Sequence, residues 1–250
     1  MTFALSFLSN GFLGKNFFKL YDGTFSNTDF ILLTVGIILT IISAYLLGSI
    51  NFAIIISSRS YKQDIRNFGS KNAGMTNMMR TYGKKAAAFT LLGDALKAIV
   101  SCLIGYVIIG QPGAYIAGLF CILGHVFPIF YRFKGGKGVV TAAATVLMCD
   151  PILFPILLAI FVIIVLFTKY ISLGSVMCIL LYPFLHYSFG KIAMGANYVS
   201  PYVMYAFAMT VIIVCKHWAN IKRLLNGTES KFSFKKSVKT ANDTQNEEDK

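Results

Sequence analysis

Residues 30–58, FILLTVGIILTIISAYLLGSINFAIIISS, decide the fold class because they include no Asp, Glu, Lys or Arg. About 20 apolar residues in a helix cross the hydrocarbon core of a bilayer, so this run is long enough for a transmembrane helix. The whole chain has the same character, since 56% of its 250 residues are hydrophobic and 13% are charged. A soluble domain carries about 25% charged residues. We therefore expect lipid to cover much of the surface.

Further apolar stretches predict an all-α membrane protein with about seven transmembrane helices: residues 30–58, 86–110, 113–131, 138–149, 151–168, 172–190 and 201–215. The fourth is short for a complete crossing. Charge supports it nevertheless. With the N-terminus outside and the C-terminus cytoplasmic, 19 of the 23 Lys and Arg residues fall in the inner segments 59–85, 132–137, 169–171 and 216–250. This distribution follows the positive-inside rule, and a five-span version keeps the same sidedness.

The chain divides into three predicted parts. Residues 1–28 form an N-terminal extracytoplasmic extension, residues 29–230 form the multi-pass membrane domain, and residues 231–250 form a disordered charged cytoplasmic tail. The net charge of +13 is explained by basic inner loops, with anionic lipid or phosphorylated substrates as a second reason, and we expect no nucleic acid partner. The five cysteines lie in apolar runs without metal-ligand spacing, so we expect no cofactor and no metal site.

The first polar segment that needs a reason is FGSKNAGMTNMMR, residues 68–80. A helix over residues 73–82, ended by Gly83, would place Asn72, Thr76 and Arg80 on one face. Ser70 and Asn72 are suited to cap its start. A helix N-terminus beside hydroxyl, amide and guanidinium donors suits a phosphate. The alternative is a capped surface helix with a solvated Arg80.

The second segment is FKGGKGVVT, residues 133–141. Its glycines allow successive N–H groups to converge on an anion, and Lys134 and Lys137 supply positive charge. The spacing does not match a Walker A loop, because Gly138 stands where Ser or Thr should follow the lysine. A basic turn at a membrane boundary is the alternative interpretation.

Other polar residues stand at the ends of the predicted helices or within them. Ser172 and Ser175 begin the sixth span and could simply cap it. His217 and Asn220 share a helix face after the last span, where Lys222 and Arg223 are expected to face lipid headgroups. Asp94 and Lys97 can pair at i and i+3, either as functional charges or as a structural ion pair. His125 is either a buried hydrogen-bonded histidine or a site residue.

Together these segments resemble the bacterial acyl-phosphate-dependent glycerol-3-phosphate acyltransferase family. The resemblance runs from about Leu46 to Phe232. It is carried by Leu47-Gly48-Ser49-Ile50, the G-S-x-N-x-G-x-T-N-x-x-R pattern from Gly69 to Arg80, Asp94 with Lys97, Leu123-Gly124-His125 with Pro128, F-K-G-G-K-G, Y-I-S-L-x-S and H-x-x-N-I-x-R-L-L-N-G. Asn51, Lys71 and Ala219 depart from the usual Pro, Gly and Glu of the family.

The resemblance implies acyl transfer from acyl phosphate to the sn-1 hydroxyl of glycerol 3-phosphate, at the cytoplasmic side of a seven-helix protein in the cell membrane. It assigns the phosphate-binding residues to Ser70, Arg80, Lys137, Ser175 and Asn220. Neighbouring motif positions add Asn72 as a further binding residue, and His217, His125 and Thr76 as catalytic candidates. The implied partners are the two substrates, membrane lipids and the enzyme that produces the acyl phosphate.

The residue inventory fits this chemistry. An acyl phosphate is already activated, so the protein has to supply proximity and charge stabilisation rather than a nucleophile. No G-x-S-x-G motif occurs in the sequence. A membrane transporter for an organic phosphate is the alternative from another class, since the same basic cluster would suit its binding site. A non-catalytic lipid-binding protein would leave Ser70, Asn72, Thr76 and Asn220 unexplained.

Overall fold

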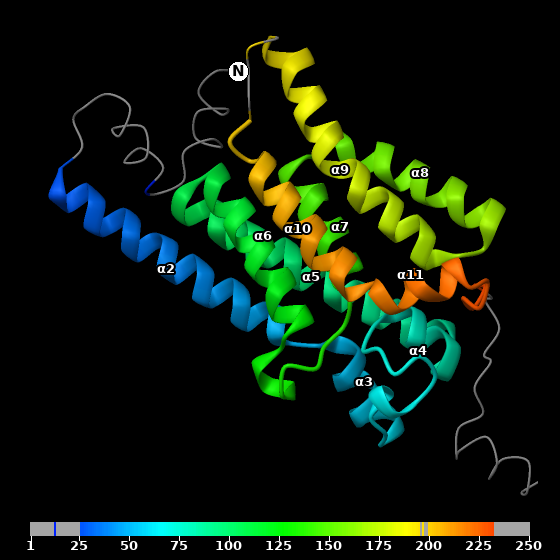
Figure 1. The fold of residues 1–250 in the computed structure, drawn as a ribbon. Coiled ribbons are helices and arrows are strands. Elements are labelled where there is room, and N and C mark those ends of the chain that lie inside the picture. Colours follow the sequence, from blue (N-terminus) through cyan, green and yellow to red (C-terminus); the bar gives the residue numbers. More distant parts are fainter. Residues whose placement is uncertain (1–12, 14–25, 196, 198–199, 233–250) are drawn as a thin grey trace, which may run out of the picture.

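The computed structural model describes residues 13, 26–195, 197 and 200–232. The predicted N-terminal extension and C-terminal tail lie mostly outside these described residues. The described part is helical and contains no strand. Its elements are α2 (Asn27–Ser49), α3 (Phe52–Tyr61), η1 (Ile65–Asn67), α4 (Met75–Tyr82), α5 (Lys84–Ile109), α6 (Gln111–Val126), η2 (Ile129–Tyr131), α7 (Val139–Cys149), α8 (Leu153–Thr168), α9 (Ile171–Met194), α10 (Val203–Lys216) and α11 (Trp218–Leu225) (Figure 1).

Each predicted apolar stretch is helical, but fewer helices than expected are long enough to cross a membrane alone. In the described part, four segments have the required length and composition: Asn27–Tyr61, Lys84–Ile109, Gln111–Tyr131 and Ile171–Met194. A fifth is possible if Val203–Lys216 and Trp218–Leu225, which meet at a 61° bend, form one span. The apolar helices α7 and α8 have only 11 and 16 residues. Seven crossings and the direction of the termini therefore remain predictions.

The span predicted over residues 30–58 is present as the segment Asn27–Tyr61, but it consists of two helices. The chain breaks between α2 and α3, where Ile50 and Asn51 are both extended. Ile50 is the C-cap of α2, and Asn51 is the N-cap of α3, where its side-chain oxygen accepts a hydrogen bond from Ile54 N at 3.1 Å. An Asn side chain in this role is a common N-cap. The break places a polar group inside the bundle, next to the loops described below.

Close backbone packing joins α2 to α6. A Cβ atom on Gly48 would lie 2.2 Å from the carbonyl oxygen of Cys121, and one on Gly124 would lie 2.3 Å from that of Tyr45. Small residues allow such close approach between helices in membranes, where apolar burial alone does not drive association. Both glycines belong to motifs that the sequence singled out, and their role here is packing.

The core lies between α6, α7, α8, α9 and α10 and includes Ile122, Val146, Leu157, Ile179 and Ile213. In Figure 1, α8 and α9 run side by side next to α10, and α3, α4 and α11 gather at one end of the bundle. Large apolar side chains such as Phe30, Leu92, Ile163 and Phe184 are more than half exposed on the outer helices. This outer surface suits lipid and not water, as composition predicted.

A polar network joins α7, α9 and the start of α10 at the C-terminal end of α7. Asp150 accepts a hydrogen bond from the Tyr182 hydroxyl at 2.6 Å and contacts His186 Nδ1 at 3.0 Å. His186 Nε2 lies 2.7 Å from the hydroxyl of Ser200. Because the polar loops 69–80 and 132–138 meet the opposite end of α7, the two ends of this short helix carry separate polar clusters.

Candidate active site

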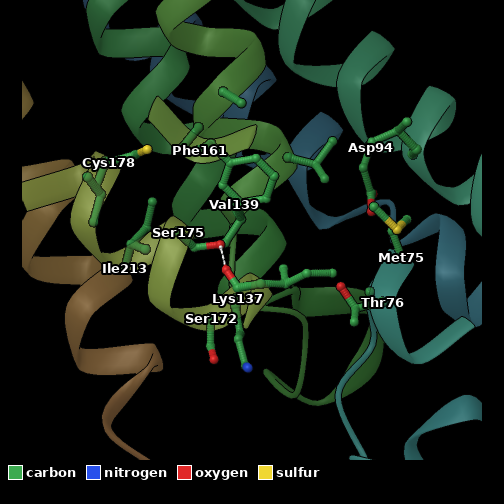
Figure 2. Close-up of a pocket in the computed structure, with 18 of the residues that line it drawn as sticks. Met75, Thr76, Asp94, Lys137, Val139, Phe161, Ser172, Ser175, Cys178 and Ile213 are labelled. Atoms are coloured by element: carbon green, nitrogen blue, oxygen red, sulfur yellow. Dashed lines mark hydrogen bonds between the residues drawn. The ribbon is translucent and has the colours of Figure 1, made fainter. Parts of the chain in front are cut away.

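One cavity of about 870 Å³ opens at one end of the bundle (Figure 2). Helices α4 and α11 lie at this end (Figure 1), and the loop before α7 and the start of α9 also line the cavity. All nine residues that sequence analysis singled out as binding or catalytic candidates line it: Ser70, Asn72, Thr76, Arg80, His125, Lys137, Ser175, His217 and Asn220. They come from five separate stretches of the chain. The fold thus brings together the predicted set, while the individual roles stay predictions.

Residues 69–80 form one side of the cavity, which we call the first wall. Asn77 holds this wall together, a role that the sequence did not predict. Its side-chain oxygen accepts from Ser70 N at 2.9 Å, and its amide nitrogen donates to the carbonyl oxygens of Phe68 and Asn72 at 2.9 and 3.1 Å. The side chain is buried. Gly69 has a φ of +54°, and a Cβ there would lie 2.3 Å from the Asn77 oxygen. A glycine is therefore required at this turn.

Helix α4 corresponds to the helix predicted over residues 73–82 and ends at Gly83 as expected. Its N-cap is Gly74 rather than Asn72, and no side chain caps it. Asn72, Thr76 and Arg80 nevertheless all face the cavity. The guanidinium of Arg80 donates to the carbonyl oxygen of Ser230 at 3.3 Å, so this side chain already points toward the C-terminal segment.

In the glycine-rich loop, only one of the two predicted lysines reaches the cavity. Lys137 lines it and donates to the side-chain oxygen of Asn220, whereas Lys134 is exposed and lies away from it. The N–H of Gly136 donates to the carbonyl oxygen of His125 at 3.1 Å, so this N–H is already used within the protein. The prediction that successive N–H groups of the loop converge on an anion is therefore not met at Gly136. The loop supplies its charge through Lys137.

Burial lowers the pKa of Lys137 to about 8, with Glu229 opposing the shift and Arg223 and Arg80 adding to it. Desolvation disfavours the charged ammonium, and neighbouring cations disfavour it further. An anionic ligand in the cavity would offset the positive charge of these neighbouring side chains. The grouping of Arg80, Lys137 and Arg223 around one cavity therefore suits an anionic ligand.

Glu229 is the site residue that sequence analysis missed. Its carboxylate accepts hydrogen bonds of 2.7 Å from Ser172, Asn220 and Arg223, and its side chain is 6% exposed. Arg223 therefore lines the cavity, a position that the sequence did not predict, while its side chain is 43% exposed. Burial raises the pKa of Glu229, but the hydrogen bonds outweigh this effect and hold the pKa below its ordinary value.

The polar side chains lie at one end of the cavity and the apolar ones at the other. Figure 2 shows Lys137, Ser172 and Thr76 at the lower end and Phe161, Val139 and Cys178 at the upper end, with Ser175 and Ile213 between them. The hydroxyl of Ser175 donates to the carbonyl oxygen of its own helix at Ile171, 2.8 Å away. Neither Ser172 nor Ser175 is the cap of α9, which is Tyr170. A site of this shape suits an amphiphile with an anionic head.

The two candidate histidines have different hydrogen-bond states. His217 Nδ1 lies 2.8 Å from the carbonyl oxygen of Ile213, which can only accept, so the Nδ1 of a neutral His217 carries the proton and its Nε2 is an acceptor. His125 Nδ1 lies 2.9 Å from the ammonium of Lys97, which can only donate. Both rings are buried and line the cavity. Of the two, only His217 has its Nδ1 proton fixed by a backbone carbonyl.

These features define a helical membrane protein with a cationic, hydrogen-bond-rich pocket beside an apolar one, as expected of an enzyme or carrier for phosphorylated lipid precursors. The family model described as "Glycerol-3-phosphate acyltransferase" matches residues 38–227. The chain therefore belongs to the glycerol-3-phosphate acyltransferase family.

Individual relatives agree with this assignment. A glycerol-3-phosphate acyltransferase of Finegoldia magna is 42% identical over 194 residues, which cover 76% of this chain and 93% of that protein. One from Thermoanaerobacter pseudethanolicus is 41% identical over 202 residues, covering 81% and 98%. The crystal structure of PlsY (YgiH), an integral membrane glycerol 3-phosphate acyltransferase in its glycerol 3-phosphate form, matches with a TM-score of 0.70 and 34% identity over 79% of this chain and 96% of that one.

The contacts of Glu229 predict its effect on stability. Glu229→Ala leaves three buried or half-buried donors without their acceptor, so we expect it to lower the free energy of unfolding by about 1–3 kcal/mol at pH 7. Glu229→Gln, which keeps an acceptor oxygen, should have a smaller effect. Because the folded-state pKa of Glu229 is lowered, its contribution is present above its ordinary pKa and is lost as the pH falls through the folded value. Thermal unfolding in detergent, followed from pH 7 down to well below the ordinary pKa of a glutamate, measures both effects, and an Ala variant as stable as wild type at pH 7 would contradict the assignment.

Proposed function

We propose that this chain transfers an acyl group from an acyl phosphate to the sn-1 hydroxyl of glycerol 3-phosphate. The products are 1-acylglycerol 3-phosphate and inorganic phosphate, as in the first acylation step of phospholipid synthesis. Membership of the family and the names of its relatives support the acceptor. A second PlsY structure, 33% identical, is described as its lysophosphatidic acid form, which is the kind of product that this reaction yields.

The observation that carries the proposal is the continuity of the cavity. Its polar end is lined by Ser70, Arg80, Lys137 and Asn220, and the same cavity continues between α5, α7, α8 and α9. That apolar part is lined by Leu91, Leu92, Val140, Leu157, Phe161 and Ile179. A phosphate and an acyl chain of one molecule would each find a matching environment. An acyl chain there remains in apolar surroundings and avoids exposure to water.

The proposed binding residues fall into two chemical groups, cations and neutral hydrogen-bonding side chains. Arg80 and Lys137 supply positive charge, and Arg80 offers several N–H donors that match phosphate oxygens. Ser70, Asn72, Ser175 and Asn220 add neutral hydrogen bonds. Asn220 already contacts both Lys137 and Glu229, so it orients one cation while it faces the cavity. Thr76 lies in the first turn of α4, and its side chain faces the cavity (Figure 2).

The reaction needs no protein nucleophile. The glycerol hydroxyl oxygen forms a bond to the acyl carbonyl carbon, and the bond from that carbon to the phosphate oxygen breaks. The phosphate leaves with the electron pair. Arg80 and Lys137 stabilise the charge on the leaving phosphate, and the cavity holds the two reactants in contact, which converts a bimolecular reaction into an effectively intramolecular one.

The proton of the attacking hydroxyl passes, in our proposal, to an oxygen of a substrate phosphate. The competing acceptor is Nε2 of His217, whose Nδ1 proton is fixed by Ile213. His125 is a weaker competitor because Lys97 occupies its Nδ1. His217→Gln keeps a polar side chain at the site and should lower kcat by less than about tenfold if phosphate is the acceptor. A fall of several orders of magnitude at unchanged KM would establish His217 as the base instead.

The deciding assay uses purified full-length protein in detergent, with palmitoyl phosphate and radiolabelled glycerol 3-phosphate. Acyl-CoA serves as the parallel donor. We expect labelled lipid from acyl phosphate only. Arg80→Ala should lower kcat/KM by about 10- to 100-fold, the range for loss of a charged hydrogen bond, whereas Lys134→Ala, a basic side chain outside the cavity, should have no effect. No product with either donor from folded protein would favour the transporter for an organic phosphate.

The lowered pKa of Lys137 predicts a pH dependence. Lys137 is protonated below about pH 8 and loses its charge above it, while the phosphate of glycerol 3-phosphate remains fully ionised. We therefore expect kcat/KM for glycerol 3-phosphate, which reports the free enzyme, to fall as the pH rises through about 8. Lys137→Arg keeps its charge throughout this range and should move the fall to higher pH. The same midpoint in both proteins would show that another group titrates.

Topology and location complete the proposal. We place residues 29–230 in one multi-pass domain of the cell membrane, with seven crossings, the N-terminus outside and the cavity facing the cytoplasm. The basic residues near the polar end, Arg59, Lys62, Lys84 and Lys134, support this side. An enzyme that produces acyl phosphate is the proposed supplier of the donor, because an activated anhydride is exposed to hydrolysis in water.

A further inference from the structure

Three ionisable side chains lie buried at the cavity, two of them inside α5 and the third at the C-terminal end of α6. They are Asp94 and Lys97 on α5 and His125 on α6, with side chains 2%, 3% and 5% exposed. The Lys97 ammonium lies 2.9 Å from the carboxylate of Asp94 and 2.9 Å from His125 Nδ1. Charges at membrane depth are costly, and they are retained where they serve a function. The proposed acyl transfer assigns no role to Asp94 or Lys97.

The third contact of Lys97 leads to the first wall of the cavity. Its ammonium donates to the carbonyl oxygen of Ile50 at 2.7 Å, at the break between α2 and α3. The next residue, Asn51, donates from its side chain to the carbonyl oxygen of Ala73 at 3.3 Å. Ala73 lies between Asn72 and the start of α4. A continuous set of polar contacts therefore joins Lys97 to the segment that carries Asn72, Thr76 and Arg80.

A second set of contacts leads from Lys97 to the glycine-rich loop that carries Lys137, which forms the second wall of the cavity. Lys97 holds the ring of His125, whose carbonyl oxygen accepts from Gly136 N at 3.1 Å. A Cβ atom on Gly136 would lie 2.2 Å from His125 Nε2 and 2.6 Å from the carbonyl oxygen of Ala73. Gly136 is therefore held between the imidazole and the first wall, and the next residue is Lys137.

We propose that Lys97, with Asp94 as its counter-ion, is a positioning residue that fixes the distance between the two cationic walls of the phosphate site. Its single ammonium forms an ion pair with Asp94 and contacts Ile50 O and His125 Nδ1, and the last two contacts lead to the two walls. The inference rests on the proposed function for the identity of the ligand. A purely structural role is the alternative. Replacement of a buried ion pair by neutral groups is often neutral for stability, so a double variant can separate the two roles.

The test separates affinity from stability. Full-length wild type and the double variant Asp94→Asn, Lys97→Met are compared for thermal unfolding, for KM with glycerol 3-phosphate, and for Kd of inorganic phosphate by calorimetry. The double variant removes both charges, so no buried charge is left unpaired. We expect unfolding temperatures within a few degrees and at least a tenfold rise in both KM and Kd. Lys97→Arg, which retains charge and donors, should remain within about threefold of wild type.

His186→Gln is the matched control, since it cuts a buried polar network of similar kind at the other end of α7. It should lower the unfolding temperature without changing KM or Kd. A folded double variant with the phosphate affinity of wild type overturns the proposal. If the double variant does not fold, Asn51→Ala decides: it cuts only the contact with Ala73 and should raise Kd at least threefold, and an unchanged Kd overturns the proposal. Phosphate binding is measured without turnover, so absence of acyl transfer by wild type would count against the proposed function alone.

Discussion

The cationic side chains of the cavity have to be held next to an apolar surface, and this constraint shapes the rest of the structure. A cation in an apolar environment is stable only with partners, and backbone groups at membrane depth must be paired within the protein. The chain satisfies both conditions by placing Arg80, Lys137 and Arg223 on helix ends and loops at one end of the bundle. Glu229 pairs with Arg223 there, and Asn220 contacts both Lys137 and Glu229.

Much of this arrangement could be predicted from the sequence, because its signals are local. The uncharged runs predicted the helices, and the four-residue spacing of Asn72, Thr76 and Arg80 predicted that they share a face. What the sequence could not give is set by contacts between distant segments. Glu229 follows a turn after α11 and has no periodicity around it. Asn77 has the sequence context of an ordinary polar residue in a helix, and its role depends on four hydrogen-bond partners that only the structure shows. The break at Asn51 could not be predicted from the sequence, because every residue around it is apolar or uncharged.

The structure also shows the surroundings of the three residues that depart from the family pattern. Asn51 makes a hydrogen bond to Ala73 that a proline side chain could not make. Lys71 has a φ of +57°, a region that glycine adopts without strain, so the usual glycine of the family fits this turn better. The Lys71 side chain is exposed and lies outside the cavity lining, so its charge adds nothing to the pocket by contact. Ala219 is exposed on α11, and the carboxylate of the site comes from Glu229 instead.

The shortness of α7 connects the fold to the chemistry. Its 11 residues span about 16 Å, roughly half of the hydrocarbon thickness, so the helix cannot present both ends to water. Gly138, with a φ of +82°, starts the helix directly after Lys137, and the ammonium is therefore desolvated enough to lower its pKa. Val140, the second residue of α7, lines the same cavity as Lys137, together with Phe161 of α8. The start of this short helix thus places a cationic side chain and an apolar wall next to each other in one cavity.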